Sequence, residues 1–118
     1  MAAAFANHYG GDVLTAASSG LAPTQGVARN TVRSMGEMNI DVSTHVPRLY
    51  NPFEVKNYDL VVNMAGYNLP GAPPRELIEW QVSDPFGASL DVYRATRNDV
   101  EQKVMRLILD LRKRQTRR

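Results

Sequence analysis

Tyr58-Asp59-Leu60-Val61-Val62-Asn63-Met64 is the clearest strand in this sequence, because its middle is apolar and β-branched over consecutive positions. An apolar run without alternation is typical of a strand that is covered on both faces of its sheet. Ile78-Glu79-Trp80-Gln81-Val82 predicts a second strand, and Asp12–Ala17 predicts a third, short one. Between the first two strands, Pro70-Gly71-Ala72-Pro73-Pro74 is a loop by composition.

Helices are expected on either side of these strands. The alanine-rich stretch Met1–Tyr9 ends at a glycine pair, and a second helix is expected over Val27–Met38, with Asn39 as a left-handed stop. A short helical turn is expected at Phe53–Lys56, and a long helix starts near Ser89. The apolar stripe of the long helix consists of Tyr93, Val100, Val104, Leu107, Ile108 and Leu111. Since helices alternate with strands, the sequence predicts parallel pairing and a three-layer α/β sandwich.

Length and composition predict one soluble globular domain over residues 1–118. No apolar run reaches the length of a membrane span, so no membrane partner is expected. The first residues lack the basic charge of a signal peptide, which makes the cytoplasm the default location. With no cysteine there is no disulfide and no thiolate metal site, and His8 and His45 have no metal-ligand spacing. We therefore expect no metal and no cofactor.

The net charge of +2 hides a basic end. Residues 106–118 hold six basic side chains against Asp110, a net of +5, so the rest of the chain carries −3. This basic helix end and tail could touch nucleic acid or an anionic surface. We favour a solvated helix end whose cations complement the helix dipole. Because no aromatic side chain is interleaved with these charges, nucleic acid is not an expected partner.

The order of five segments resembles the low-molecular-weight protein tyrosine phosphatases and the related thioredoxin-coupled arsenate reductases. Each segment alone is weakly specific, but together they run through essentially the whole chain in the family's order. The five segments are Met1–Ala6, Ser18-Ser19-Gly20, Ile40–His45, Tyr58–Val62 and Trp80–Gly87.

The resemblance implies roles for four residues. Asp84, in Ser83-Asp84-Pro85-Phe86-Gly87, matches the general acid that protonates the leaving phenolate oxygen. Phe86 matches a tyrosine that packs against the substrate ring, and Ser18 and His45 match residues that hydrogen-bond behind the phosphate-binding loop. From the residues alone, Asp-Pro also simply begins a turn after a strand, Phe86 also fits core or rim packing, and His45 fits a surface loop.

The departure from the family is equally specific. In the family a first strand and a Cys-(five residues)-Arg-Ser loop precede the first helix, and that loop supplies the thiolate nucleophile and cradles the phosphate. This sequence has no cysteine, and Arg29 and Arg33 lie one helix too late to serve as the loop arginine. The resemblance thus implies a sheet of the family's 2-1-3-4 order with its first, central strand missing.

Three functions stay open at this point. The first is a phosphatase-like domain that is inactive as given and acts through binding, with phosphate or another anion as a possible ligand. The second is a tyrosine phosphatase or arsenate reductase whose recorded chain starts at an internal methionine. The third is an interaction domain completed by self-association. Because a missing central strand leaves unpaired edges on Asp12–Ala17 and Tyr58–Met64, we expect a homodimer or a sheet in which these two strands pair directly.

Overall fold

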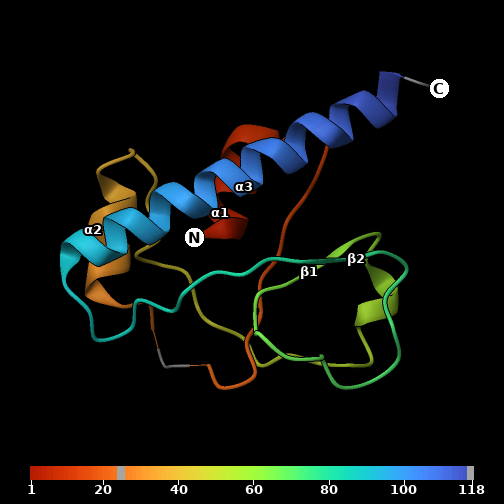
Figure 1. Cartoon of the computed structure of the whole chain (residues 1–118), viewed down its shortest axis with the longest axis horizontal. Coiled ribbons are helices and arrows are strands. Elements are labelled where there is room, and N and C mark those ends of the chain that lie inside the picture. The colour runs from red at the N-terminus through yellow and green to blue at the C-terminus, as the bar shows by residue number, and fades with distance from the viewer. Residues whose placement is uncertain (24–25, 117–118) are drawn as a thin grey trace.

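The computed structural model of the chain describes residues 1–23 and 26–116. Its elements are α1 (Ala2–Gly10), α2 (Arg29–Gly36), the 3-10 helix η1 (Val55–Asn57), β1 (Val61–Asn63), β2 (Leu77–Glu79) and α3 (Leu90–Thr116). In Figure 1, α3 runs along the molecule, with α1 and α2 beside it and the two strands below it in this view. The α/β class with a short parallel sheet, predicted from the sequence, is confirmed.

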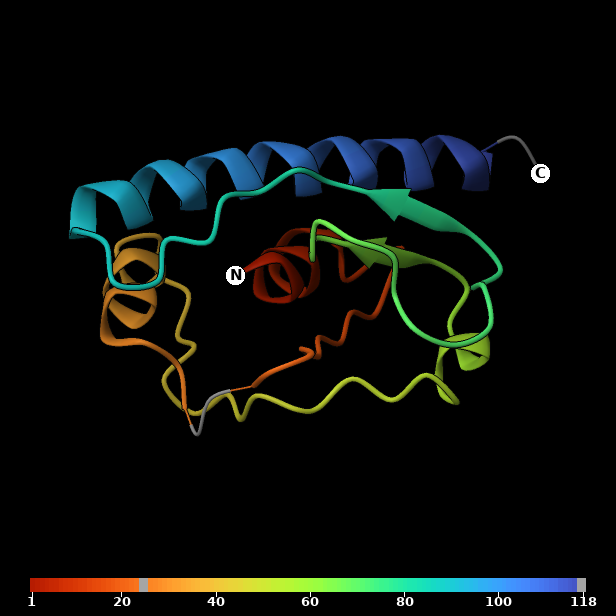
Figure 2. The same cartoon turned by 60° about the horizontal axis from the view of Figure 1, so that its bottom comes forward.

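The sheet consists of β1 and β2, which pair in parallel with Val62 opposite Ile78. The ladder continues one step beyond the strands, because the Trp80 N–H donates to the Asn63 carbonyl at 3.0 Å. Both strands are shorter than the sequence predicts, and the second lies one residue earlier. Figure 2 shows the strands beneath α3, with the irregular segment 39–54 along the opposite side of the molecule.

The hydrophobic core lies between the three helices rather than on the sheet. The buried residues of this core are Phe5, Ala6, Met35, Ile40, Val42, Val100, Val104 and Ile108. In α3, the buried residues Tyr93, Val100, Val104 and Ile108 all belong to the predicted apolar stripe. Trp80 and Val82, which follow β2, are half-buried against this core. The long helix therefore organises the fold.

The predicted stops of α1 and α2 are largely where the sequence placed them. Asn39 has a φ of 60°, so it takes the left-handed conformation expected at a helix end. The Ile40 N–H then donates back to the Met35 carbonyl at 3.1 Å, which closes the end of α2. Helix α2 begins at Arg29, two residues after its predicted start. The 3-10 helix η1 begins at Val55, two residues after the predicted start of the helical turn.

The prediction of a strand over Asp12–Ala17 is wrong for this structure. Gly11 to Val13 form a turn, and residues 14–17 belong to no strand. The Ala16 N–H and C=O are hydrogen-bonded instead to the Asn7 side chain, at 2.8 and 2.9 Å. An extended segment becomes a strand only when a neighbouring strand takes its backbone groups, and no described residue does so. The expected direct pairing of this segment with β1 is accordingly not formed.

Candidate functional site

The loop between β2 and α3 carries the predicted acid, Asp84. Its Oδ1 accepts a hydrogen bond from the Phe86 N–H at 3.0 Å, which makes a tight turn around Pro85. The turn closes with the Ala88 N–H donating to the Pro85 carbonyl at 2.8 Å. Gly87 has a φ of +77°, a conformation that other residues rarely adopt. This backbone therefore holds the Asp84 carboxylate at the surface, in a fixed turn.

The side chain of Phe86 points into solvent with 75% of its surface exposed. A ring this exposed contributes little to the core. The loop is tied to α2, because the Asn30 Nδ2 donates to the Ala88 carbonyl at 3.4 Å. Asp84 and Phe86 thus stand together on one exposed loop that is anchored at its far end.

Ser18 and His45 lie close together. The Ser18 Oγ lies 3.4 Å from the His45 Nε2, and both side chains are exposed. Their two loops are joined by a parallel bridge, in which the Gly20 N–H donates to Arg48 O at 2.9 Å and the Tyr50 N–H donates to Gly20 O at 2.8 Å. No hydrogen bond among the described residues links this pair to Asp84 or Phe86. The structure therefore gives two separate pairs.

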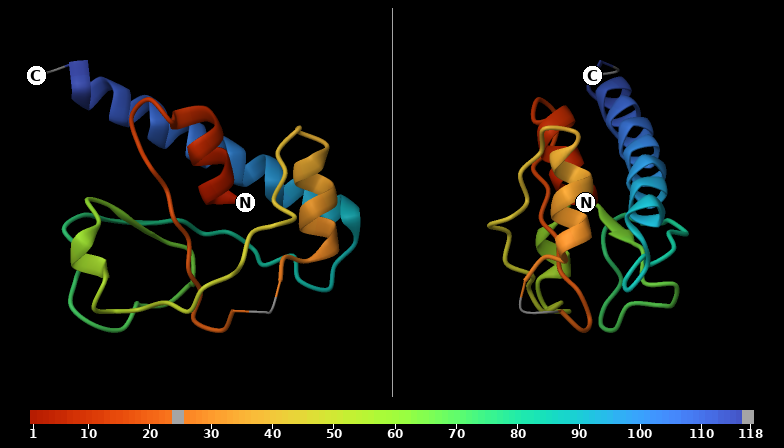
Figure 3. Two further views of the ribbon diagram at one scale, coloured as in Figure 1. Left: turned by 180° about the vertical axis from the view of Figure 1, so that it is seen from behind. Right: turned by 90° about the vertical axis from the view of Figure 1, so that its left-hand side faces the viewer.

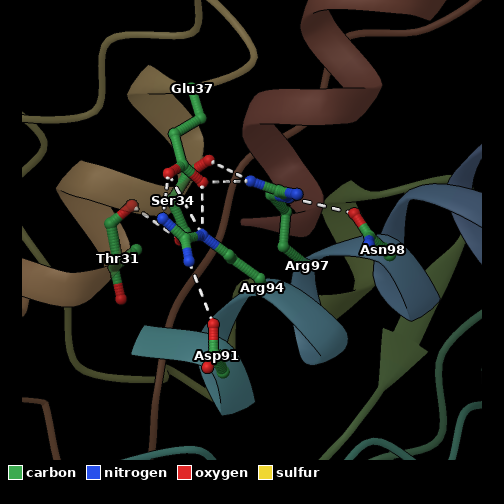
Figure 4. Close-up of polar contacts among 7 residues, drawn as sticks. All are labelled: Thr31, Ser34, Glu37, Asp91, Arg94, Arg97 and Asn98. Atoms are coloured by element: carbon green, nitrogen blue, oxygen red, sulfur yellow. Dashed lines mark hydrogen bonds and ion pairs between the residues drawn. The ribbon is translucent and has the colours of Figure 1, made fainter. Parts of the chain in front are cut away.

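A third cluster, which sequence reasoning missed, joins α2 to α3 (Figure 4). The Arg94 Nη2 donates to the Glu37 Oε2 at 2.6 Å, and the Arg97 Nη1 donates to the Glu37 Oε1 at 2.8 Å. Arg94 also donates to Asp91 at 3.0 Å. The hydrogen bond from Arg94 is the main cause that lowers the pKa of the Glu37 carboxyl to about 2. Glu37 is thereby kept ionised and is unsuited to proton transfer at neutral pH.

The signal for this cluster was present in the sequence. Arg97 is only 9% exposed and lies on the buried stripe of α3, between Tyr93 and Val100. A charged residue at an apolar position of a helix indicates a partner inside the molecule. Here the partner is partly backbone, since the Arg97 Nη1 also donates to the Ser34 carbonyl at 2.8 Å. That carbonyl belongs to the last turn of α2, where the helix lacks its own donors.

The basic helix end is engaged within the molecule. Arg112 donates to both carboxylate oxygens of Asp12, at 3.0 Å each, and Arg114 donates to both oxygens of Glu76, at 2.8 Å each. These hydrogen bonds lower the pKa values of Asp12 and Glu76. Arg117 and Arg118, the end of the predicted basic tail, lie outside the described residues.

The described residues hold no cluster of His, Cys, Asp or Glu that could bind a metal ion. None of the helices over these residues combines the length and apolarity that crossing a membrane requires. One apolar hollow is lined by Pro52, Phe53, Val55 and Pro73 together with Lys56, Gly71 and Ala72. Since none of the four predicted site residues lines it, it is separate from the predicted site.

The chain has a parallel α/β fold, with an Asp-Pro turn leading into its last helix and a Ser–His pair between two loops. The family model of the low molecular weight phosphotyrosine protein phosphatases matches residues 1–117, and the chain belongs to this family.

Named relatives of this chain are arsenate reductases. The chain is 33% identical to the glutaredoxin arsenate reductase of Synechocystis sp., over 92% of this chain and 85% of that protein. It is 27% identical to an arsenate reductase of Bacillus cereus, over 90% of this chain and 81% of that protein. A solved arsenate reductase in the phosphate binding state superposes with a TM-score of 0.81 at 31% identity, covering 93% of this chain and 86% of the other.

Proposed function

We propose that this polypeptide is a phosphatase-family domain that acts through binding and does not catalyse phosphoryl transfer by itself. One observation carries the proposal: the 118 residues contain no cysteine, although Asp84 and Phe86 stand exposed on the loop that bears the family's acid. In the family, a thiolate attacks phosphorus and Asp84's counterpart protonates the leaving group. A general acid without a nucleophile has no intermediate to release.

Catalysis in the family also needs groups that stabilise the transferred phosphoryl group. Backbone amides and an arginine of the phosphate loop stabilise the charge of the transition state. Two arginines of α3 do not replace them, because Arg94 and Arg97 are bound to Glu37. Each of these catalytic contributions is worth on the order of 10²-fold in rate, so their joint absence predicts a negligible turnover.

The test is hydrolysis of para-nitrophenyl phosphate at mildly acid pH by the purified chain. We expect no turnover beyond that of a matched Asp84→Ala preparation, which reports contaminating phosphatases. Clear turnover that Asp84→Ala abolishes, while Asp99→Ala leaves it unchanged, would contradict the proposal. Arsenate reduction is expected to be absent for the same reason, because the reductases cycle through cysteine thiols.

A second candidate function is phosphatase or arsenate reductase activity in a longer polypeptide. The observation that favours it is that relatives aligned over about nine tenths of this chain are named arsenate reductases, and the chain spans 85% of the Synechocystis protein. The deciding measurement is the nucleotide sequence that precedes the Met1 codon. A reading frame encoding an apolar strand and Cys-(five residues)-Arg selects this candidate, and the longer protein should then show activity that depends on Asp84. Stop codons immediately upstream eliminate it.

A further inference from the structure

The apolar hollow lies where η1 meets the loop that leads into β2. Its volume is about 260 Å³, and its lining residues belong to two segments, 52–56 and 71–73. Figure 3 shows from behind that η1 and this loop lie at the same end of the molecule, opposite to α2. None of the four residues of the predicted site lines it. What the hollow binds is therefore a question separate from the predicted site.

The two walls of the hollow are held together by a glycine contact and a hydrogen bond. A methyl group on Gly71 would lie 2.5 Å from the Pro52 Cβ, so the loop approaches this closely only with glycine. Gly71 also has a φ of +96°, which other residues rarely adopt. Beside this contact, the Tyr50 hydroxyl donates to the Pro70 carbonyl at 3.1 Å. The hollow is thus formed before a ligand arrives, and binding requires little ordering of its walls.

The lining of the hollow is apolar and partly aromatic. Val55, only 5% exposed, lies on its inner side, whereas the Phe53 ring is 84% exposed and lies on its outer side. The backbone at Phe53 is fixed, because the Phe53 N–H donates to the Asn51 Oδ1 at 2.9 Å. Pro52 and Pro73 add rigid rings to the walls. This lining favours a flat apolar group, which buries its faces and stacks on the Phe53 ring.

A single cation accompanies these apolar side chains. Among the described residues that line the hollow, Lys56 alone is charged. Its ammonium group forms no ion pair with any described residue. An unpaired ammonium beside an apolar hollow attracts an anionic group, and a carboxylate accepts the hydrogen bonds that the ammonium donates. Charge and lining therefore select together for a ligand with a flat apolar part and an acidic part.

We propose that this hollow binds small aromatic carboxylates, with the ring against Phe53 and the two prolines and the carboxylate on Lys56. The size agrees, since a cavity of about 150 Å³ holds benzene, and the 260 Å³ found here leaves room for a carboxylate on the ring. Because the contact is small and partly open to water, the expected dissociation constant lies in the low millimolar range. The inference does not depend on the proposed lack of catalysis, since it uses none of the residues of the predicted site.

The first experiment titrates the isotope-labelled protein with cinnamate and follows the amide chemical shifts. We expect saturable shifts that are largest over 53–57 and 71–72, the residues around the hollow. Cinnamyl alcohol, which has the same ring system without the charge, should bind about fivefold more weakly, as the loss of an exposed ion pair implies. Added salt should narrow this difference. Shifts centred elsewhere in the chain, no saturation, or equal affinities for the two compounds would overturn the proposal.

The second experiment uses variants at exposed positions, which should leave the fold unchanged in circular dichroism. Lys56→Gln should weaken cinnamate binding about fivefold and leave cinnamyl alcohol unaffected, since it removes only the charge. Phe53→Ser should weaken the binding of both compounds. Arg106→Gln is the matched control, because it removes one positive charge from the exposed side of α3, and it should change neither affinity. Equal losses in Lys56→Gln and Arg106→Gln, or unchanged binding in Phe53→Ser, would overturn the proposed site.

Discussion

At the scale of single residues, the Glu37 carboxylate is the most perturbed acid that the structure describes. Its two oxygens accept hydrogen bonds from both Arg94 and Arg97, on a different helix. The pKa of Glu37 falls from 4.5 to about 2, with the Arg94 hydrogen bond as the largest cause. Because the folded pKa is the lower one, the cluster stabilises the fold fully above the unfolded pKa and loses this effect as the pH falls toward 2.

The first residue-scale prediction concerns Glu37→Gln, measured as the thermal midpoint by circular dichroism. The thermal midpoint of the wild type should exceed that of the variant by a constant margin from pH 7 down to about pH 5. The margin should then shrink as the pH falls from about 4.5 to about 2, because protonation removes the same charge in the wild type. Glu54→Gln is the control, since its carboxylate has no ion pair among the described residues. A margin that stays constant down to pH 2 would contradict the assigned pKa.

At the scale of elements, the contact between α1 and α3 depends on a glycine. A methyl group on Gly10 would lie 2.8 Å from the Ile108 Cγ1 and 2.9 Å from its Cδ1. Ile108 is fully buried in the core and has little room to move. Gly10 is therefore required by the close approach of the two helices, although alanine is the better helix former.

Gly10→Ala is expected to destabilise the protein by up to about 2 kcal/mol, because an overpacking cost of about 1–3 kcal/mol outweighs the gain of about 1 kcal/mol in helix propensity. The measurement is urea denaturation. Ile108→Ala alone should cost about 2–5 kcal/mol, and the double variant should cost clearly less than the two single losses together. Additive losses would show that the two side chains do not compete for the same space.

The features that the sequence predicts correctly at this scale are those that depend on residues close together along the chain. The stripe of α3, the left-handed turn at Asn39 and the turn around Asp84 depend on neighbours along the chain, and each is confirmed. The strand expected over Asp12–Ala17 failed because a strand depends on a partner that only the whole fold can supply. Arg97 and Glu37 are 60 positions apart, so their hydrogen bond could not be read from spacing alone.

At the scale of the whole molecule, stability is distributed unevenly. Most of the core lies on the helices, whereas β1 and β2 are three residues each and contribute no residue to it. The one buried residue of the two strands, Asn63, is polar. Short two-stranded pairs are marginal without packing. Amide hydrogen exchange should therefore be slowest over 100–108 in α3.

The corresponding prediction is that the Asn63 and Trp80 amides exchange at least about 100-fold faster than those of Val104 and Ile108. The Val62 N–H, which has no hydrogen-bond partner among the described residues, is the unprotected control on the same strand. Uniform protection would mean that the sheet and the helices open as one unit.

Helix α3 has a mechanical consequence for anyone who builds on this domain. Its 27 residues span about 40 Å, nearly the full 43 Å length of the molecule, and its last turns are fastened by Arg112 and Arg114. A helical protein fused directly after Thr116, as a continuous α-helix, would share the axis of α3 without a flexible linker. The orientation of the fused protein could be set by inserting residues one at a time, because each residue rotates it by about 100° around the helix axis.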